Sequence, residues 1–139
     1  MNNYSPLLLD TCAILFFSAA RGLNQKAVES IDVAAEQRQL YVSAISSWEI
    51  GQLNSSGKLA LTQDPLSFFH EFVKRSSAQI NDLSPEILVG SHFLPGSFHK
   101  DPMDRILVAT ARMNAFTLVT SDRAILAYGQ QGHVKTLAC

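Results

Sequence analysis

Four acidic residues stand where a folded chain could bring them together: Asp10, Glu49, Asp104 and Asp122. Asp10 and Asp122 each follow a short apolar run, Glu49 lies within a helical apolar pattern, and Asp104 follows an Asp-Pro helix start. Two ionised carboxylates about 4 Å apart repel by roughly 4 kcal/mol at an effective dielectric near 20, so such a cluster requires a cation or raised pKa values. Oxygen ligands alone suit Mg²⁺ or Mn²⁺ better than zinc, which prefers His or Cys. The pattern predicts a divalent-metal site suited to phosphoryl chemistry.

The aspartates also have structural alternatives. Asp10 and Asp122 precede helical patterns, where an Asp side chain commonly accepts hydrogen bonds from the free N–H groups of the helix. Asp104 could pair with Arg105 or face solvent. Glu49 has no capping role inside a helix, and an unpaired buried carboxylate is costly. The sequence therefore leaves a structural and a functional interpretation open for each aspartate, and favours the functional one for Glu49.

Six further residues adjoin these acids. The hydroxyls of Thr11, Thr120 and Ser121 could bind a metal-bound water or a phosphate, or cap helices, and Ser121 is the preferred choice. His99 and Lys100 could reach a phosphate or orient a carboxylate, or they could belong to a solvated loop. Arg105 could bind a phosphate through two parallel hydrogen bonds or hold a neighbouring acid in place.

Apolar periodicity gives the elements that must position these side chains. Strands are expected at residues 4–9, 40–42, 80–83, 116–120 and 134–137, and helices at 11–20, 24–38, 43–56, 84–94 and 103–114, with others starting at Asp64-Pro65 and after Asp122. This alternation predicts an α/β fold with a twisted, mainly parallel sheet of four to five strands flanked by helices. Ligands of such sheets bind beyond the carboxyl ends of the strands, where Asp10 and Asp122 fall.

Several apolar residues are expected inside the protein or at a dimer contact. Four aromatic residues have helical spacing and are expected as core or dimer contacts rather than as base-stacking platforms: Trp48, Phe68, Phe69 and Phe72. Leu66 belongs to the same helical stripe as Phe69 and Phe72. Cys12 is expected as a small core residue.

Composition limits the protein class. The 139 residues predict a single domain over 1–139, and 47% hydrophobic with 17% charged residues is typical of a soluble globular protein. The formal net charge of -1 excludes a generally basic nucleic-acid coat, so any contact with nucleic acid has to be local. The two cysteines are too few for a disulfide framework, and no signal peptide or membrane span is recognised. We expect a cytoplasmic protein.

The segments LLLDT, SSWEI with a following GKL, HKDPMDRILVATA and LVTSD resemble, in order and spacing, the four acidic motifs of the PIN-domain family, in particular its VapC branch. The resemblance covers nearly the whole chain and implies a PIN-like three-layer sandwich. It also implies that Asp10, Glu49, Asp104 and Asp122 line a site for Mg²⁺ or Mn²⁺ and that the protein cleaves RNA endonucleolytically. A VapB-like antitoxin that holds the toxin inactive, and a homodimer that builds the RNA groove, are further implications.

The sequence departs from the family pattern in two places. Many relatives carry a basic residue shortly after the helical glutamate, whereas here Lys58 is the nearest positive charge. Only His99 precedes the third motif, where two adjacent histidines are often found. With these departures, Lys58, Lys100, Arg105 and Arg123 are the candidate phosphate contacts.

Three other classes compete with a nuclease. A receiver-like Mg²⁺-binding signalling domain would need adjacent acids near the first strand and a lysine after a late strand, and this sequence has neither. A haloacid-dehalogenase-like phosphatase would need a second aspartate where Cys12 stands. A non-catalytic PIN-fold binding module is disfavoured because all four acids are present.

Overall fold

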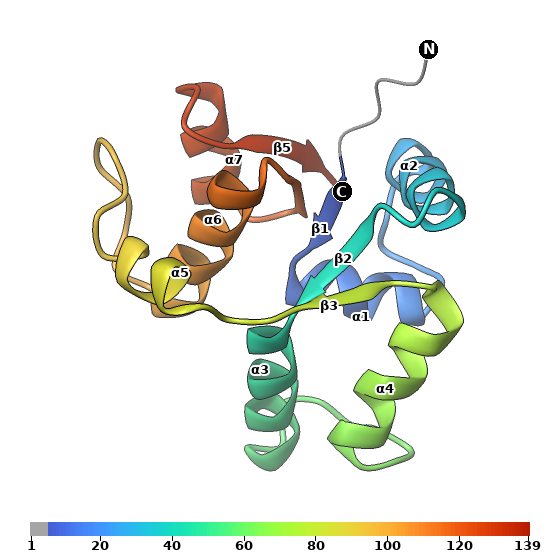
Figure 1. Cartoon of the computed structure of the whole chain (residues 1–139). Coiled ribbons are helices and arrows are strands. Elements are labelled where there is room, and N and C mark those ends of the chain that lie inside the picture. The colour runs from blue at the N-terminus through green and yellow to red at the C-terminus, as the bar shows by residue number, and fades with distance from the viewer. Residues whose placement is uncertain (1–5) are drawn as a thin grey trace.

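A single parallel sheet forms the centre of the protein (Figure 1). The structure, a computed structural model, describes residues 6–139. The strands are β1 Leu7–Leu9, β2 Leu40–Ser43, β3 Gln79–Asn81, β4 Thr117–Thr120 and β5 Lys135–Ala138. They are ordered β3-β2-β1-β4-β5, and every neighbouring pair is parallel. The predicted α/β fold with a parallel sheet is confirmed; residues 4 and 5 of the expected first strand lie outside the described residues.

Helices connect the strands in the predicted order. Their bounds are α1 Thr11–Ser18, α2 Gln25–Glu36, α3 Ala44–Ser55, α4 Pro65–Ser76, α5 Pro85–Gly90, α6 Pro102–Asn114 and α7 Arg123–Gln130. Two predicted N-caps are confirmed: Asn24 accepts from the backbone N–H of Ala27 at 2.8 Å and Asp64 from that of Ser67 at 2.9 Å. Helix α5 ends at Gly90, earlier than expected, with Ser91 as its C-cap.

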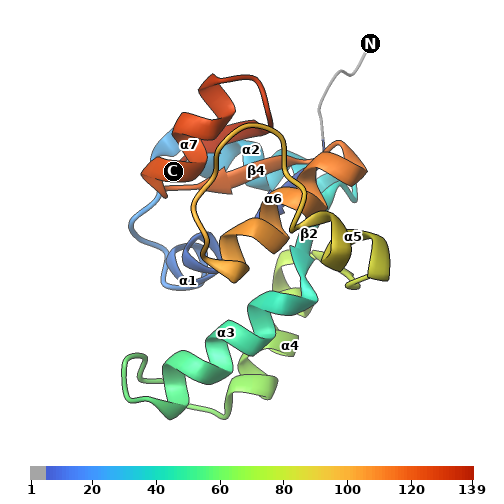
Figure 2. The ribbon, with the colours of Figure 1, turned by 90° about the vertical axis from the view of Figure 1, so that its left-hand side faces the viewer.

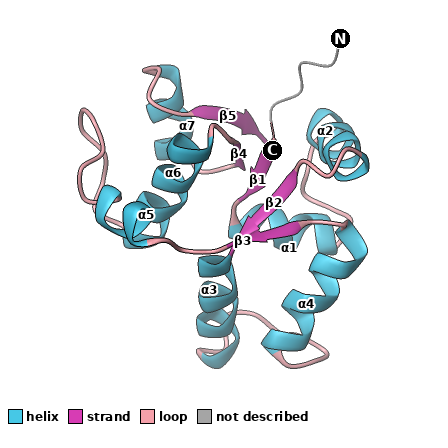
Figure 3. Ribbon diagram, viewed as in Figure 1, coloured by secondary structure: helices cyan, strands magenta, loops and turns pink. Residues whose placement is uncertain are grey.

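The strands alternate their side chains between two apolar layers, and helices cover both faces of the sheet (Figure 3). Leu9 and Val119 belong to the cluster that α1, α2, α3 and α4 complete, with Ile14, Ile31 and Phe69 among its members. On the other face, side chains from β1 and β4 pack with α6 and α7: Leu8, Leu118, Leu107, Val108, Ile125 and Tyr128. The arrangement is the predicted three-layer sandwich.

The structure changes the expectation for three apolar side chains. Leu66 is 62% exposed and does not belong to the core, whereas Phe69 and Phe72 are buried as expected. Trp48 is 56% exposed, which excludes the core and leaves the dimer contact as a prediction. Helix α3 projects from the edge of the sheet beside α4 (Figures 1 and 2), and much of its surface therefore faces solvent. Cys12 is exposed rather than part of the core.

Within residues 6–139, no helix has both the length and the apolar character needed to cross a membrane.

Candidate active site

The carboxyl ends of β1 and β4 bring Asp10 and Asp122 close together. These two strands are direct neighbours, and the backbone N–H of Asp10 donates to the carbonyl of Val119 at 3.1 Å. Thr120 links the two acids: its Oγ1 accepts from the backbone N–H of Asp122 at 3.0 Å, and its side chain also hydrogen-bonds to Asp10. Their charges are coupled, since burial raises the pKa of Asp10 and the charges of Glu49 and Asp122 raise it further.

Both strand-end aspartates also act as helix caps. Asp10 Oδ1 accepts from the backbone N–H of Ala13 at 2.7 Å at the start of α1. Asp122 Oδ1 accepts from the backbone N–H of Ile125 at 2.9 Å at the start of α7. Capping occupies one oxygen of each carboxylate and leaves the second able to accept or ligate. The structural and functional interpretations of these residues are therefore compatible.

Glu49 and Asp104 approach the same place from two helices. Glu49 is half-buried on α3, and Asp104 lies in the first turn of α6 with a side chain that is 21% exposed. Burial raises the pKa of Asp104 to about 7, and four further carboxylates contribute: Asp101, Asp122, Glu49 and Asp10. A carboxyl group half protonated near neutral pH is a sign that negative charge is concentrated around it.

Cys12 gives a second measure of this convergence. Its pKa is raised to about 11, first by partial burial and then by the charges of all four acids: Asp10, Glu49, Asp104 and Asp122. One thiol is thus influenced by residues that are widely separated in the sequence. The four carboxylates therefore lie in the same region at the carboxyl edge of the sheet.

His99 joins the most compact part of this cluster. One ligand atom from each of His99, Asp104 and Asp122 lies within 4.8 Å of the others. His99 Nε2 lies 3.2 Å from Asp104 Oδ2, while its Nδ1 accepts from the backbone N–H of Asp101 at 3.2 Å. An imidazole whose Nδ1 accepts carries its proton on Nε2, so His99 donates to Asp104. Of the alternatives for His99, the geometry favours the one in which it orients a carboxylate.

Arg105 forms different contacts from those expected. Its Nε donates to the carbonyl of Ser91 at 2.8 Å, and its Nη1 donates to the carbonyls of Phe98 and His99, each at 3.0 Å. Within residues 6–139 it forms no ion pair with a carboxylate. Arg105 therefore ties the loop between α5 and α6, and with it His99, to the start of α6.

The remaining predicted residues are distributed around the cluster. The Thr11 hydroxyl donates to the buried Ser46 hydroxyl at 3.0 Å and so links α1 to α3. Ser121, the preferred choice, is exposed, whereas the Thr120 side chain contacts both Asp10 and Asp122. Lys100 is exposed beside His99, whereas the exposed Lys58 lies beyond the end of α3 that is farthest from the sheet.

Ser46 is a residue that the sequence analysis missed. It lies four positions before the buried Ile50, and this spacing on α3 was the available signal that it faces inward.

The donor set fits a hard divalent cation. With the Nε2 proton of His99 engaged by Asp104, the ligands that remain are carboxylate oxygens, which suit Mg²⁺ or Mn²⁺. Burial raises the pKa of Asp104, and the neighbouring carboxylates raise it further; a dication would offset that repulsion between carboxylates.

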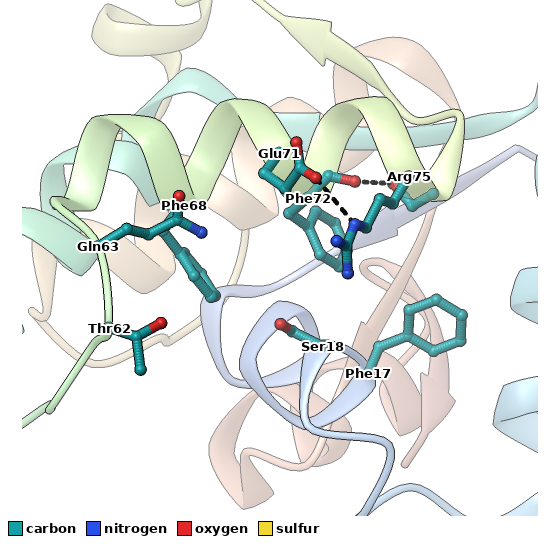
Figure 4. Close-up of a pocket in the computed structure, with 9 residues that line it drawn as sticks. Phe17, Ser18, Thr62, Gln63, Phe68, Glu71, Phe72 and Arg75 are labelled. Carbon is teal, nitrogen blue, oxygen red and sulfur yellow. Dashed lines mark hydrogen bonds and ion pairs between the residues drawn. The ribbon is translucent and has the colours of Figure 1, made fainter.

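A separate hollow of about 580 Å³ lies between α1 and α4 (Figure 4). Phe17, Phe68 and Phe72 give it an aromatic wall, and an ion pair between Glu71 and Arg75, with Nε and Oε1 at 2.9 Å, lies at its rim. None of the predicted site residues lines this hollow, so the catalytic interpretation does not depend on it.

No protein-family model matches the sequence. A search of curated proteins finds Ribonuclease VapC22 of Mycobacterium tuberculosis, which is 30% identical over 122 residues, covering 87% of this chain and 90% of the relative. The chain belongs to the VapC family of ribonucleases. This VapC chain carries that family's PIN-like fold, in agreement with the resemblance of its four acidic motifs.

Solved structures share the fold of this VapC chain. VapBC2 from Rickettsia felis, bound to a DNA fragment from its promoter, matches with a TM-score of 0.68 at 16% identity and covers 95% of this chain and 97% of the matched chain. FitAcB from Neisseria gonorrhoeae matches with a TM-score of 0.60 at 19% identity, covering 94% and 96%. At these identities the likeness concerns the fold alone.

Proposed function

We propose that this chain is a metal-dependent endoribonuclease that hydrolyses RNA phosphodiester bonds with Mg²⁺ or Mn²⁺. The observation that carries the proposal is that Asp10, Glu49, Asp104 and Asp122 lie near one another; burial raises the pKa of Asp104 to about 7, and the charges of Asp101 and of the other three acids add to the rise. Membership of a ribonuclease family supports the same chemistry. The four acids hold the ion directly or through water.

The surrounding residues keep these acids in fixed orientations. The capping bonds of Asp10 and Asp122 set the direction of each carboxylate, and His99 sets that of Asp104. The N-termini of α1, α6 and α7 lie at the acids, and their positive ends reduce the cost of gathering negative charge. When bound, the ion would lower the pKa of a water and stabilise charge on the phosphodiester. The exposed cations Lys100 and Arg123 are proposed to contact RNA phosphates.

The proposal extends to the biological role. We infer a single-domain toxin that works in the cytoplasm, forms a homodimer and is held inactive by a VapB-like antitoxin. The structures that share this fold include VapBC2 and a toxin–antitoxin complex from Klebsiella pneumoniae, which supports a protein partner of this kind. Copurification with the product of a neighbouring antitoxin gene would test the partner, and solution mass would test the dimer.

The activity is tested with purified protein and total cellular RNA, in Mg²⁺ or Mn²⁺ and in chelator. Asp10→Asn is the site variant, because Asn still caps a helix but removes the charge. Asp64→Asn is the matched control, since Asp64 caps α4 in the same manner and is outside the acid cluster. Discrete fragments that require metal and Asp10 but not Asp64 support the proposal. RNA binding without cleavage would favour a non-catalytic PIN-fold module.

A further inference from the structure

A second hollow lies on the other side of the α6 N-terminus from the acids. It measures about 470 Å³ and is formed by α5, the following loop and α6. Its lining residues are Leu88, Ser91, His92, Phe98, Lys100, Pro102, Arg105 and Ile106. Figures 1 and 2 show the loop between α5 and α6 arching outward beside α6.

The chemistry of this hollow is both apolar and cationic. Leu88, Phe98 and Ile106 supply apolar surface from three different segments, and Leu88 remains 40% exposed. Lys100 and His92 add basic side chains, and none of the lining residues is acidic. In the described part of the chain, Lys100 has no carboxylate within ion-pair distance. A flat apolar group joined to an anion fits this combination.

The hollow adjoins the acid cluster through two pairs of consecutive residues. His99 hydrogen-bonds to Asp104 on the acid side of the loop, and the next residue, Lys100, lines the hollow. On α6, Asp104 belongs to the cluster and the next residue, Arg105, lines the hollow. The hollow and the acid cluster therefore share the end of the loop before α6 and the first turn of α6.

The walls of the hollow are held in place by Arg105. Its Nε and Nη1 bind the carbonyls of Ser91, Phe98 and His99, which fixes the loop against α6. The Nη2 group makes none of these three bonds, so its two N–H groups can donate to a ligand. The hollow therefore has a framework that is formed before any ligand binds.

We propose that this hollow binds one unpaired nucleotide of the RNA, next to the phosphodiester that is cleaved. Its base lies against Leu88, Phe98 and Ile106, and its phosphate lies at Lys100. This inference rests on the proposed ribonuclease function and assigns a place to the nucleotide. The nucleotide has to be unpaired, because a base inside a duplex is stacked and paired and cannot enter a side pocket.

Binding is measured separately from cleavage, in an Asp10→Asn background and by fluorescence anisotropy. The probe is a short fluorescein-labelled single-stranded RNA of mixed sequence, compared with the same RNA annealed to its complement. Lys100→Ala and Leu88→Asn test the cationic and the apolar parts of the hollow; both residues are exposed, so the core is unaffected. Lys74→Ala is the matched control, an exposed lysine on α4 that does not line the hollow.

We expect tighter binding of the single strand than of the duplex, and a loss of about 5- to 10-fold in single-strand affinity for Lys100→Ala and for Leu88→Asn. Lys100→Ala should also reduce the slope of log affinity against log salt by about 0.7, the value for one phosphate contact in a single strand. Lys74→Ala should leave affinity and slope unchanged.

Three results would overturn the inference. The first is equal affinity for single-stranded and duplex RNA. The second is hollow variants that bind as tightly as the Lys74 control. The third is a change in solution mass for Leu88→Asn without a change in affinity, which would assign the hollow to a contact between two copies of the chain. If the binding pattern holds but the unmodified protein cleaves no RNA, the proposed function fails and the nucleotide pocket stands. If the protein cleaves RNA in a metal-dependent manner but the hollow variants bind RNA as tightly as the control, the nucleotide pocket fails and the proposed function stands.

Discussion

Replacing Asp104 by Asn should stabilise the metal-free protein at alkaline pH. Asp104 has a pKa of about 7 in the folded protein, against a usual value of 3.8, because of burial and neighbouring carboxylates. A raised carboxyl pKa means that ionisation opposes folding: the cost is absent below pH 3.8, grows as the pH rises and is complete above pH 7. The neutral amide of Asn carries no such cost, and its oxygen can still accept from His99.

The size of the effect follows from the same pKa. One pKa unit corresponds to about 1.4 kcal/mol, so the rise has an upper limit of about 4 kcal/mol. Solvent contact of a side chain that is 21% exposed weakens the charge interactions, which leaves about 1 to 2 kcal/mol. For a chain of this length that is about 3 to 8 °C in Tm. At about pH 5 the gain should fall to less than half, because Asp104 is then protonated in the folded protein.

Thermal unfolding followed by circular dichroism in chelator, at about pH 8 and pH 5, measures this difference. Asp64→Asn serves as the control with the opposite sign. Hydrogen bonds from the backbone and side chain of Ser67 lower the pKa of Asp64, so its ionised form favours folding and Asn loses that contribution at pH 8. The reasoning is refuted if Asp104→Asn has no higher Tm than the unmodified protein at pH 8, or if its gain is equal at both pH values.

Three further substitutions test individual contacts. Thr11→Val leaves the buried Ser46 hydroxyl without its donor and should lower the free energy of unfolding by about 1 to 3 kcal/mol in urea, whereas Thr11→Ser should stay close to the unmodified protein. Arg105→Lys cannot reproduce three bonds to separate carbonyls and should speed amide hydrogen exchange in the loop before α6; unchanged exchange would contradict its anchoring role. His99→Ala should weaken Mn²⁺ binding about 10- to 100-fold by calorimetry, and equal affinity would show that its bond to Asp104 has no effect on the ion.

Much of the fold could be predicted because local signals agree with the tertiary structure. Asn24 and Asp64 mark helix starts through a cap that depends on neighbouring backbone groups alone. The apolar runs of β1 and β4 are buried on both faces, as expected for inner parallel strands, and this placed Asp10 and Asp122 at one sheet edge.

The rest depended on contacts between distant segments. Trp48 lies on a helix that projects from the sheet, and its exposure is set by the absence of a neighbouring layer, which helical periodicity does not report. Arg105 binds carbonyls of a loop whose path has no sequence signature. Ser121 and Thr120 are adjacent hydroxyl residues, and only the direction of the strand end decides that Thr120 faces Asp10. Tertiary geometry therefore supplied the details that sequence could not.

The central claim is tested most directly by a crystal structure, determined from crystals grown at about pH 8 with Mn²⁺. Anomalous differences would locate the ion. The account predicts an anomalous peak between the carboxylates of Asp104 and Asp122, within coordinating distance of their oxygens and held directly or through water by Asp10 and Glu49. Mn²⁺ bound elsewhere on the protein, with no peak among these acids, would contradict it.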